Sequence, residues 1–276
     1  MAAFMRVWIL SIVCASSSGA LAAEPLTILY VGNSYTYTYD IPAVVRDLAV
    51  DAGYPGPLVG VLAQPAWFLS THRANPDTAT ILDTFTIDVV VLQEQSLRPT
   101  DPFNPGQFKD DATWFYDRLK AKSPNAKVVL YETWARAPGD ALYPGTFFNP
   151  AIMQSQLRTH YTDAALSYIP AHSSAARKTD VSVAPVGDAW ERELGTFGIG
   201  LHDPDLSHPN FDGAYLCGLV LFSSIYHTPT HGLSALGRDP TTAAKLQTVA
   251  DSMVPEPGGG VALGLVVVAL LPRRRR

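Results

Sequence analysis

The amino-acid sequence predicts one doubly wound α/β domain with a mostly parallel, five-stranded sheet. Apolar runs of strand length recur along the chain, and segments with helical spacing alternate with them. The near-continuous Val, Ile and Leu content of these runs is typical of parallel strands that are buried on both faces. A hydrophobic content of 47% and a charged content of 16% are those of a globular protein with a substantial core. The five expected strands are residues 26–31, 58–62, 88–93, 127–133 and 181–185.

Helix signals fill the intervals between these strands. Asp40 is a favourable N-cap, Pro42 falls in the first turn that follows it, and Gly53 is expected to end the helix. We find no internal repeat and no sign of a second domain. Further helices are expected at residues 105–122, 150–169, 211–226 and 240–253.

The first residues have the pattern of a secretory signal peptide. Arg6 precedes an apolar run at residues 7–15, and small residues end in Ala-Leu-Ala at positions 20–22. A basic, an apolar and a small-residue region in this order predict export, with cleavage by signal peptidase after residue 22 or 23. We therefore expect residues 1–22 to be a signal peptide and residues 24–253 to be the folded domain.

The last residues, 254–276, consist of Val-Pro-Glu-Pro, a glycine hinge, an apolar run at 261–271 and four arginines. As a helix, the apolar run would rise only ~16 Å, about half of a bilayer's hydrocarbon core, so we expect a short membrane-retention tail. The order of these three parts also resembles the PEP-CTERM sorting signal of bacteria. The resemblance implies that an exosortase-type enzyme processes the tail and delivers the protein to the cell envelope or extracellular matrix, after transient membrane anchoring.

The charge balance argues against nucleic acid as a partner. Arg6 and the four C-terminal arginines account for five of the 20 basic residues, whereas Glu256 is the one acidic residue at either end among 25. The domain between the ends is therefore acidic, and phosphate neutralisation needs a basic surface. Of the two cysteines, Cys14 lies in the expected signal, so Cys217 has no partner for an intramolecular disulfide or a thiolate zinc site.

Candidate catalytic residues follow the first and the last core segments. Ser34 comes directly after the first strand, on a turn where Gly32 allows close approach of the backbone. Serine needs a base to become a nucleophile, and Asp205 and His208 lie three residues apart in a proline-flanked loop. This spacing allows the carboxylate to hold one imidazole nitrogen while the other faces the serine.

These segments resemble the blocks of the SGNH (GDSL-like) hydrolases. The segment Val-Gly-Asn-Ser-Tyr-Thr at 31–36 is similar to their first block, with Asn33 where Asp is usual, and Asp-Leu-Ser-His-Pro at 205–209 is similar to their last. The chain is most similar to a subgroup with a Gly-Asn-Ser-Tyr-Thr first block, over residues 26–226. The resemblance implies a flavodoxin-like domain of the SGNH-hydrolase type, a Ser34 nucleophile, a His208 base and an orienting Asp205, with no cofactor and no metal.

The resemblance also implies an oxyanion hole from Ser34 and from the second and third blocks, where this chain departs from the family. Ala66 stands where the second-block glycine belongs, and Gln95 stands where an asparagine normally donates its side-chain amide. Because one oxyanion donor is worth about 3 kcal/mol, a misplaced Gln95 would impair catalysis.

Two alternatives stay open from the residues. His202, Asp203, Asp205 and His208 have the residue types of a zinc or iron site, which would make a metal-dependent hydrolase. A damaged oxyanion hole would leave a carbohydrate- or matrix-binding module with the same fold. The main hypothesis is an exported serine esterase that removes acyl groups, such as acetyl, from an extracellular polysaccharide. Candidate substrate contacts are Tyr35, Trp67 and His72, with Tyr37, Tyr39 and Trp134 as further sugar-stacking candidates.

Overall fold

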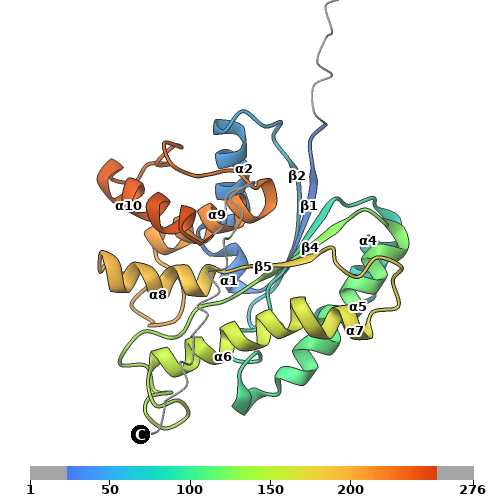
Figure 1. The fold of residues 1–276 in the computed structure, drawn as a ribbon, viewed down its shortest axis with the longest axis horizontal. Coiled ribbons are helices and arrows are strands. Elements are labelled where there is room, and N and C mark those ends of the chain that lie inside the picture. Colours follow the sequence, from blue (N-terminus) through green and yellow to red (C-terminus); the bar gives the residue numbers. More distant parts are fainter. Residues whose placement is uncertain (1–23, 254–276) are drawn as a thin grey trace, which may run out of the picture.

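The computed structural model describes residues 24–253, which form a three-layer arrangement of helices, sheet and helices (Figure 1). The expected signal peptide and sorting tail lie outside the described residues. Within residues 24–253, no helix is long and apolar enough to cross a membrane.

The five predicted strands all form, and every pairing between them is parallel. Their order across the sheet is β2-β1-β3-β4-β5, so the chain winds outward in both directions from β1 and β3. In doubly wound sheets, ligands bind at such a switch point, beyond the carboxyl ends of the strands. The strands are β1 (Thr27–Gly32), β2 (Leu58–Ala63), β3 (Val89–Leu92), β4 (Lys127–Tyr131) and β5 (Val181–Ala184).

Helices cover both faces of the sheet (Figure 1). One face carries α2 (Ile41–Asp51), α8 (Val186–Thr196), α9 (Phe211–Tyr226) and α10 (Pro240–Asp251). The other carries α3 (Leu69–Ala74), α4 (Pro76–Thr84), α5 (Pro105–Lys122), α6 (Pro150–Asp163) and α7 (Ile169–His172), with the π-helical turn η3 (Ala164–Tyr168) between the last two. The short elements α1 (Ser34–Tyr37), η1 (Thr38–Asp40) and η2 (Asp101–Phe103) complete the chain.

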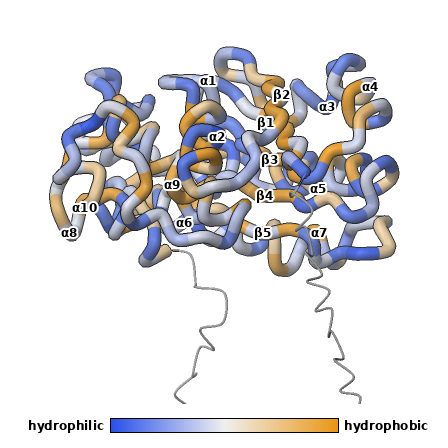
Figure 2. The backbone as a smooth tube through the Cα atoms, turned by 90° about the horizontal axis from the view of Figure 1, so that it is seen from above, coloured by the Kyte–Doolittle hydropathy of each residue, from blue (hydrophilic) through white to orange (hydrophobic). Residues whose placement is uncertain are grey.

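Each central strand divides its side chains between two cores. In β1, Ile28 and Tyr30 pack into the core under α2 and α9, whereas Leu29 and Val31 pack into the core under α5 and α6. This follows from the alternation of side chains along a strand and explains why the runs are continuously apolar. Figure 2 shows the hydrophobic backbone segments gathered in the strands and along α9.

The edge strand β2 corrects one expectation. We expected all five strands to be buried on both faces, but the first four residues of β2 are exposed. The reason is its position, because β2 pairs with β1 alone and leaves its other edge free.

Every predicted helix forms, one of them is longer than expected, and the structure holds further helices between them. Asp40 caps α2 as expected, and its side chain accepts a hydrogen bond from the N–H of Ala43. No helix was predicted where α3 and α4 form, and the helix expected at 150–169 continues through η3 to His172.

Candidate active site

Ser34 is the first residue of α1, directly after β1 and a bend at Asn33. The Oδ1 atom of Asn33 accepts a hydrogen bond from the N–H of Tyr35 at 3.1 Å and so caps this short helix. A Cβ atom at Gly32 would lie 2.3 Å from Oγ1 of Thr36, so only glycine fits there. As the first residue of a helix, Ser34 has no intrahelical acceptor for its own N–H.

His208 and Asp205 reach Ser34 from the loop between α8 and α9. Nε2 of His208 lies 2.8 Å from Oγ of Ser34, and Nδ1 lies 2.5 Å from Oδ2 of Asp205. Because a carboxylate can only accept, Nδ1 carries the proton, and neutral Nε2 accepts from the serine hydroxyl. The three side chains, predicted from segments 174 residues apart, are joined in one hydrogen-bonded chain.

Asp205 is held as a carboxylate by its own loop. Its Oδ1 atom accepts from the N–H of Ser207 at 3.0 Å and from the N–H of His208 at 2.9 Å. Burial alone would raise the pKa of Asp205, but the hydrogen bonds from the His208 ring and these N–H groups outweigh it and lower the pKa to about 2. The group that orients His208 is therefore ionised at every pH at which the protein would work.

The loop that carries this pair is closed by its own backbone. His202 and Pro209 form an isolated antiparallel bridge, and the N–H of Asp203 donates to the carbonyl of His208 at 2.9 Å. The indole N–H of Trp134 donates to the carbonyl of Ser207 at 3.0 Å, which ties the loop to the end of β4. The position of His208 thus rests on a fixed frame rather than on the side chains alone.

Ala66 takes the backbone conformation that a glycine would favour. Its φ is +59°, and the turn around it closes through the N–H of Trp67, which donates to the carbonyl of Gln64 at 3.2 Å. Pro65 followed by a left-handed residue is the pattern of a type II turn. An alanine there costs about 1 kcal/mol more than glycine would.

The segment after β3 positions the turn of Ser34 through Gln93. The Oε1 atom of Gln93 accepts from the N–H of Asn33 at 2.8 Å and from the hydroxyl of Thr36 at 2.9 Å. The next side chain, Glu94, accepts from the N–H groups of Leu69 at 3.1 Å and Gln95 at 2.6 Å through the same oxygen. Burial raises the pKa of Glu94 to about 8, although these N–H groups lower it. Glu94 thereby joins the start of α3 to the segment after β3.

Gln95 is half-buried, and its side chain is fixed at one end. Its Oε1 atom accepts from the N–H of Leu97 at 2.9 Å, which leaves the Nε2 group as the part able to donate elsewhere. This is the group that an oxyanion role requires.

Of the predicted substrate contacts, Tyr35 and His72 are buried and bonded to protein groups. The hydroxyl of Tyr35 lies 2.8 Å from Oγ of Ser207, and its ring stacks on Trp134 at 4.5 Å. Nε2 of His72 lies 2.7 Å from the carbonyl of Gly32 at the end of β1, and burial lowers the pKa of the His72 imidazole. These two residues therefore support the site from within, which corrects their assignment as substrate contacts.

The remaining aromatic candidates differ in exposure. Trp67 is half-buried and packs on His72, and its carbonyl accepts a hydrogen bond from the side-chain amide of Asn33. Tyr37 and Tyr39 are exposed, whereas Trp134 is 1% exposed. Trp134 is stacked between Tyr35 and Trp190, the latter at 4.0 Å, so it too is a packing residue rather than a sugar platform.

The residues suggested for a metal point to different partners. His202 directs Nε2 to the carbonyl of Ala135 at 3.0 Å, whereas His208 is bonded to Ser34 and Asp205. Among residues 24–253, no group of three or more His, Cys, Asp or Glu side chains is placed to hold a metal ion.

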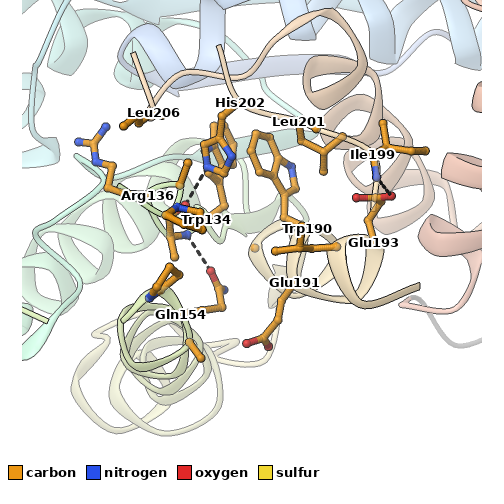
Figure 3. A pocket seen from close by; sticks show the side chains of 18 of the residues that line it. Trp134, Arg136, Gln154, Trp190, Glu191, Glu193, Ile199, Leu201, His202 and Leu206 are labelled. Carbon is orange, nitrogen blue, oxygen red and sulfur yellow. Dashed lines mark hydrogen bonds between the residues drawn. The ribbon is translucent and has the colours of Figure 1, made fainter. Parts of the chain in front are cut away.

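Sequence reasoning missed a cavity beside the triad loop and the arginine that lines it. The cavity has a volume of about 790 Å³ and lies between the segment after β4, α8 and the loop before α9 (Figure 3). Arg136 donates from Nη1 to the hydroxyl of Tyr35 at 2.8 Å and from Nη2 to Oγ of Ser96 at 2.9 Å. No local pattern marks this residue, because its partners come from distant segments.

Comparison with known proteins places this architecture among hydrolase folds. No protein-family model and no curated protein matches the sequence. A protein from Slackia heliotrinireducens proposed to be an SGNH hydrolase is 23% identical, with a TM-score of 0.60 over 73% of this chain and 100% of that chain. The lipase/acylhydrolase from Enterococcus faecalis is 12% identical, with a TM-score of 0.54 over 73% of this chain and 96% of that one. A carbohydrate esterase family 3 protein from Talaromyces cellulolyticus is 15% identical, with a TM-score of 0.51 over 73% and 97%. The chain therefore shares its fold with the SGNH and GDSL-like hydrolases.

Proposed function

We propose that this chain is a serine esterase that transfers an acyl group to Ser34 and then to water. The observation that carries the proposal is the hydrogen-bonded chain from Ser34 through His208 to Asp205, with heavy-atom distances of 2.8 Å and 2.5 Å. Its order and geometry are those of a nucleophile, a general base and an orienting carboxylate.

In the first step, His208 accepts the hydroxyl proton as Oγ of Ser34 attacks the ester carbonyl. Asp205, kept ionised by its loop, stabilises the imidazolium that forms. The negative oxygen is held by the N–H of Ser34, the N–H of Ala66 and the Nε2 group of Gln95. His208 then protonates the leaving alcohol, and a water molecule activated by His208 releases the acid.

The natural substrate we propose is an ester on an extracellular polysaccharide. The basis is the predicted export and sorting signals, together with exposed aromatic side chains near the triad loop, such as Tyr39. Among proteins with this fold, the one from Talaromyces cellulolyticus is described as a carbohydrate esterase. Signal peptidase and an exosortase-type enzyme are the proposed processing partners, and the cell envelope or matrix is the proposed location.

The test is hydrolysis of para-nitrophenyl acetate and butyrate by the purified protein beside two variants. Ser34→Ala removes the nucleophile, and Ser182→Ala is the matched control, because Ser182 lies exposed on β5. We expect turnover to be lost in the first variant and kept in the second. Turnover that survives in Ser34→Ala but is abolished by a chelator would instead support the metal-dependent alternative. No turnover in any protein would favour the binding module.

A further inference from the structure

Arg136 is a half-buried cation whose hydrogen-bond partners are neutral. It follows β4, and its guanidinium donates to the hydroxyls of Tyr35 and Ser96. Within residues 24–253, no carboxylate oxygen lies within 4.0 Å of this guanidinium. By contrast, Arg158 and Arg238, which also have limited exposure, both reach carboxylates.

The partners of Arg136 place it beside each part of the proposed catalytic apparatus. Tyr35 follows the nucleophile Ser34, and Ser96 follows the oxyanion candidate Gln95. The hydroxyl of Tyr35 also lies 2.8 Å from Oγ of Ser207, the residue before His208. The Tyr35 ring connects Arg136 to the triad, because its centroid lies 5.6 Å from the guanidinium carbon and 5.3 Å from the centroid of the His208 ring.

The cavity beside Arg136 offers the space for a bound group. Arg136 is the one lysine or arginine among the described residues that line the cavity, and Figure 3 shows it at the opposite end from Glu193. Each carboxylate in the lining has at least one partner of its own, although Oε2 of Glu193 is buried without one. Glu191 pairs with Arg158, Glu193 accepts from the N–H of Ile199 at 2.7 Å, and Asp203 accepts from the hydroxyl of Tyr39 at 3.4 Å.

Partial burial of a charge costs free energy unless an opposite charge lies nearby, and a bound molecule can supply that opposite charge. The guanidinium has more N–H donors than its two bonds use, and its planar fork suits a carboxylate. We propose that Arg136 binds a carboxylate of the substrate, so that the preferred ester carries a negative charge on its acid part or on its alcohol part. This inference rests on the proposed esterase function and names the class of ester.

The test compares matched esters in the wild-type protein and in Arg136→Gln. The acid side is tested with para-nitrophenyl butyrate against para-nitrophenyl hemisuccinate, and the alcohol side with phenyl acetate against para-acetoxybenzoate. For each pair, kcat/KM for the charged ester is divided by kcat/KM for the neutral ester. This ratio in the variant is then divided by the ratio in the wild type, which cancels the intrinsic reactivity of the esters. In the variant, we expect kcat/KM for the charged ester of one pair to fall about tenfold to a hundredfold more than kcat/KM for its neutral partner. This is the range expected for the loss of a charged hydrogen bond. The pair that responds identifies the side that bears the carboxylate.

Two controls separate substrate binding from a structural role. Arg192→Gln removes the same charge from an exposed position on α8 and should leave both ratios unchanged. Arg136→Lys keeps the charge and should recover part of the preference, provided that its melting temperature matches the wild type. Equal loss on charged and neutral esters would show that Arg136 only holds Tyr35 and Ser96, and would overturn the inference, as would ratios that do not change.

If the wild-type protein hydrolyses none of these esters, the esterase proposal fails, and the carboxylate site is still tested by binding. The probe is then N-ethylsuccinamate, the amide analogue of a succinate ester, titrated by calorimetry into the wild type and Arg136→Gln. Binding that is lost in the variant supports the site. No binding to either protein, or equal binding to both, overturns it.

Discussion

Gln93 holds the residue before the nucleophile: its Oε1 atom accepts the backbone N–H of Asn33 at 2.8 Å. The same oxygen lies only 2.5 Å from the place that a Cβ atom at Gly32 would occupy. The turn that presents Ser34 therefore depends on a buried amide from the neighbouring strand and on a glycine that leaves room for it.

This packing predicts that Gly32→Ala is strongly destabilising. The added methyl group would have to displace both Gln93 and Thr36, and overpacking of this kind costs about 1–3 kcal/mol. We expect chemical denaturation to show that loss and esterase activity to fall with it. Gly145→Ala is the control, because a Cβ atom there meets nothing within 4 Å. Equal stability of the two variants would contradict the packing argument.

The left-handed backbone of Ala66 predicts a stabilising substitution. Ala66→Gly removes the steric cost of a positive φ, partly offset by the greater freedom of glycine in the unfolded chain. We therefore expect the free energy of unfolding to rise by up to about 1 kcal/mol and the activity to be retained. Ala79→Gly, inside α4, should instead lose about 1 kcal/mol. A loss of stability in both variants would mean that the turn does not require the left-handed conformation.

The role of Asp205 predicts a variant that folds but turns over slowly. Asp205→Asn keeps the shape of the side chain but removes the negative charge that stabilises the imidazolium, so kcat should fall by about 10³-fold or more. The lowered pKa of Asp205 also gives a stability contribution that is present above pH 4 and is lost as the pH falls towards 2. Denaturation curves from pH 2 to pH 6 should therefore converge for the wild type and Asp205→Asn at the acid end. Normal turnover in this variant would remove Asp205 from the mechanism.

The raised pKa of Glu94 predicts a second pH dependence of stability, opposite in sign to that of Asp205. Its pKa is raised from 4.5 to about 8, so between these values the folded protein holds a proton that the unfolded chain releases. Stability should therefore fall as the pH rises from about 5 to 8. Glu94→Gln, which resembles the protonated acid and does not titrate, should flatten this part of the curve.

Urea denaturation of both proteins at several pH values measures the difference. Asp111 raises and Arg98 lowers the pKa of Glu94, and both remain in the variant. Glu24→Gln, at an exposed position, is the control and should leave the pH dependence as it is. Parallel curves for the wild type and Glu94→Gln would show that Glu94 is ionised in the folded protein at neutral pH.

The alternation of strands and helices was predictable, because each element carries its own local signal. Pro105 and Pro150, where two of the predicted helices begin, follow asparagines that cap α5 and α6. Asn75 and Pro76 begin α4 in the same way, but no helix was predicted for this segment. The exposure of β2 could not be predicted, since it depends on the order of strands in the sheet and not on the composition of one strand.

In the candidate site, too, the residues with a local sequence signal were predicted and those without one were not. Ser34, Asp205 and His208 were found because they lie in short segments of characteristic composition, and the structure joins them by hydrogen bonds. Gln93 and Arg136 were not found, because their partners lie 60 and 101 residues away. A glutamine after a strand, or an arginine in a loop after a strand, has no local feature that distinguishes it from a surface residue.

The stack of Tyr35, Trp134 and Trp190 gives the site an optical signal of its own. The two indole rings lie 4.0 Å apart and are inclined by 9°, close enough for their electronic transitions to couple. Trp134 also bonds to the loop of His208, so any rearrangement of that loop changes the coupled chromophore. Near-ultraviolet circular dichroism can therefore follow the assembly of the triad without a substrate, a label or a turnover assay.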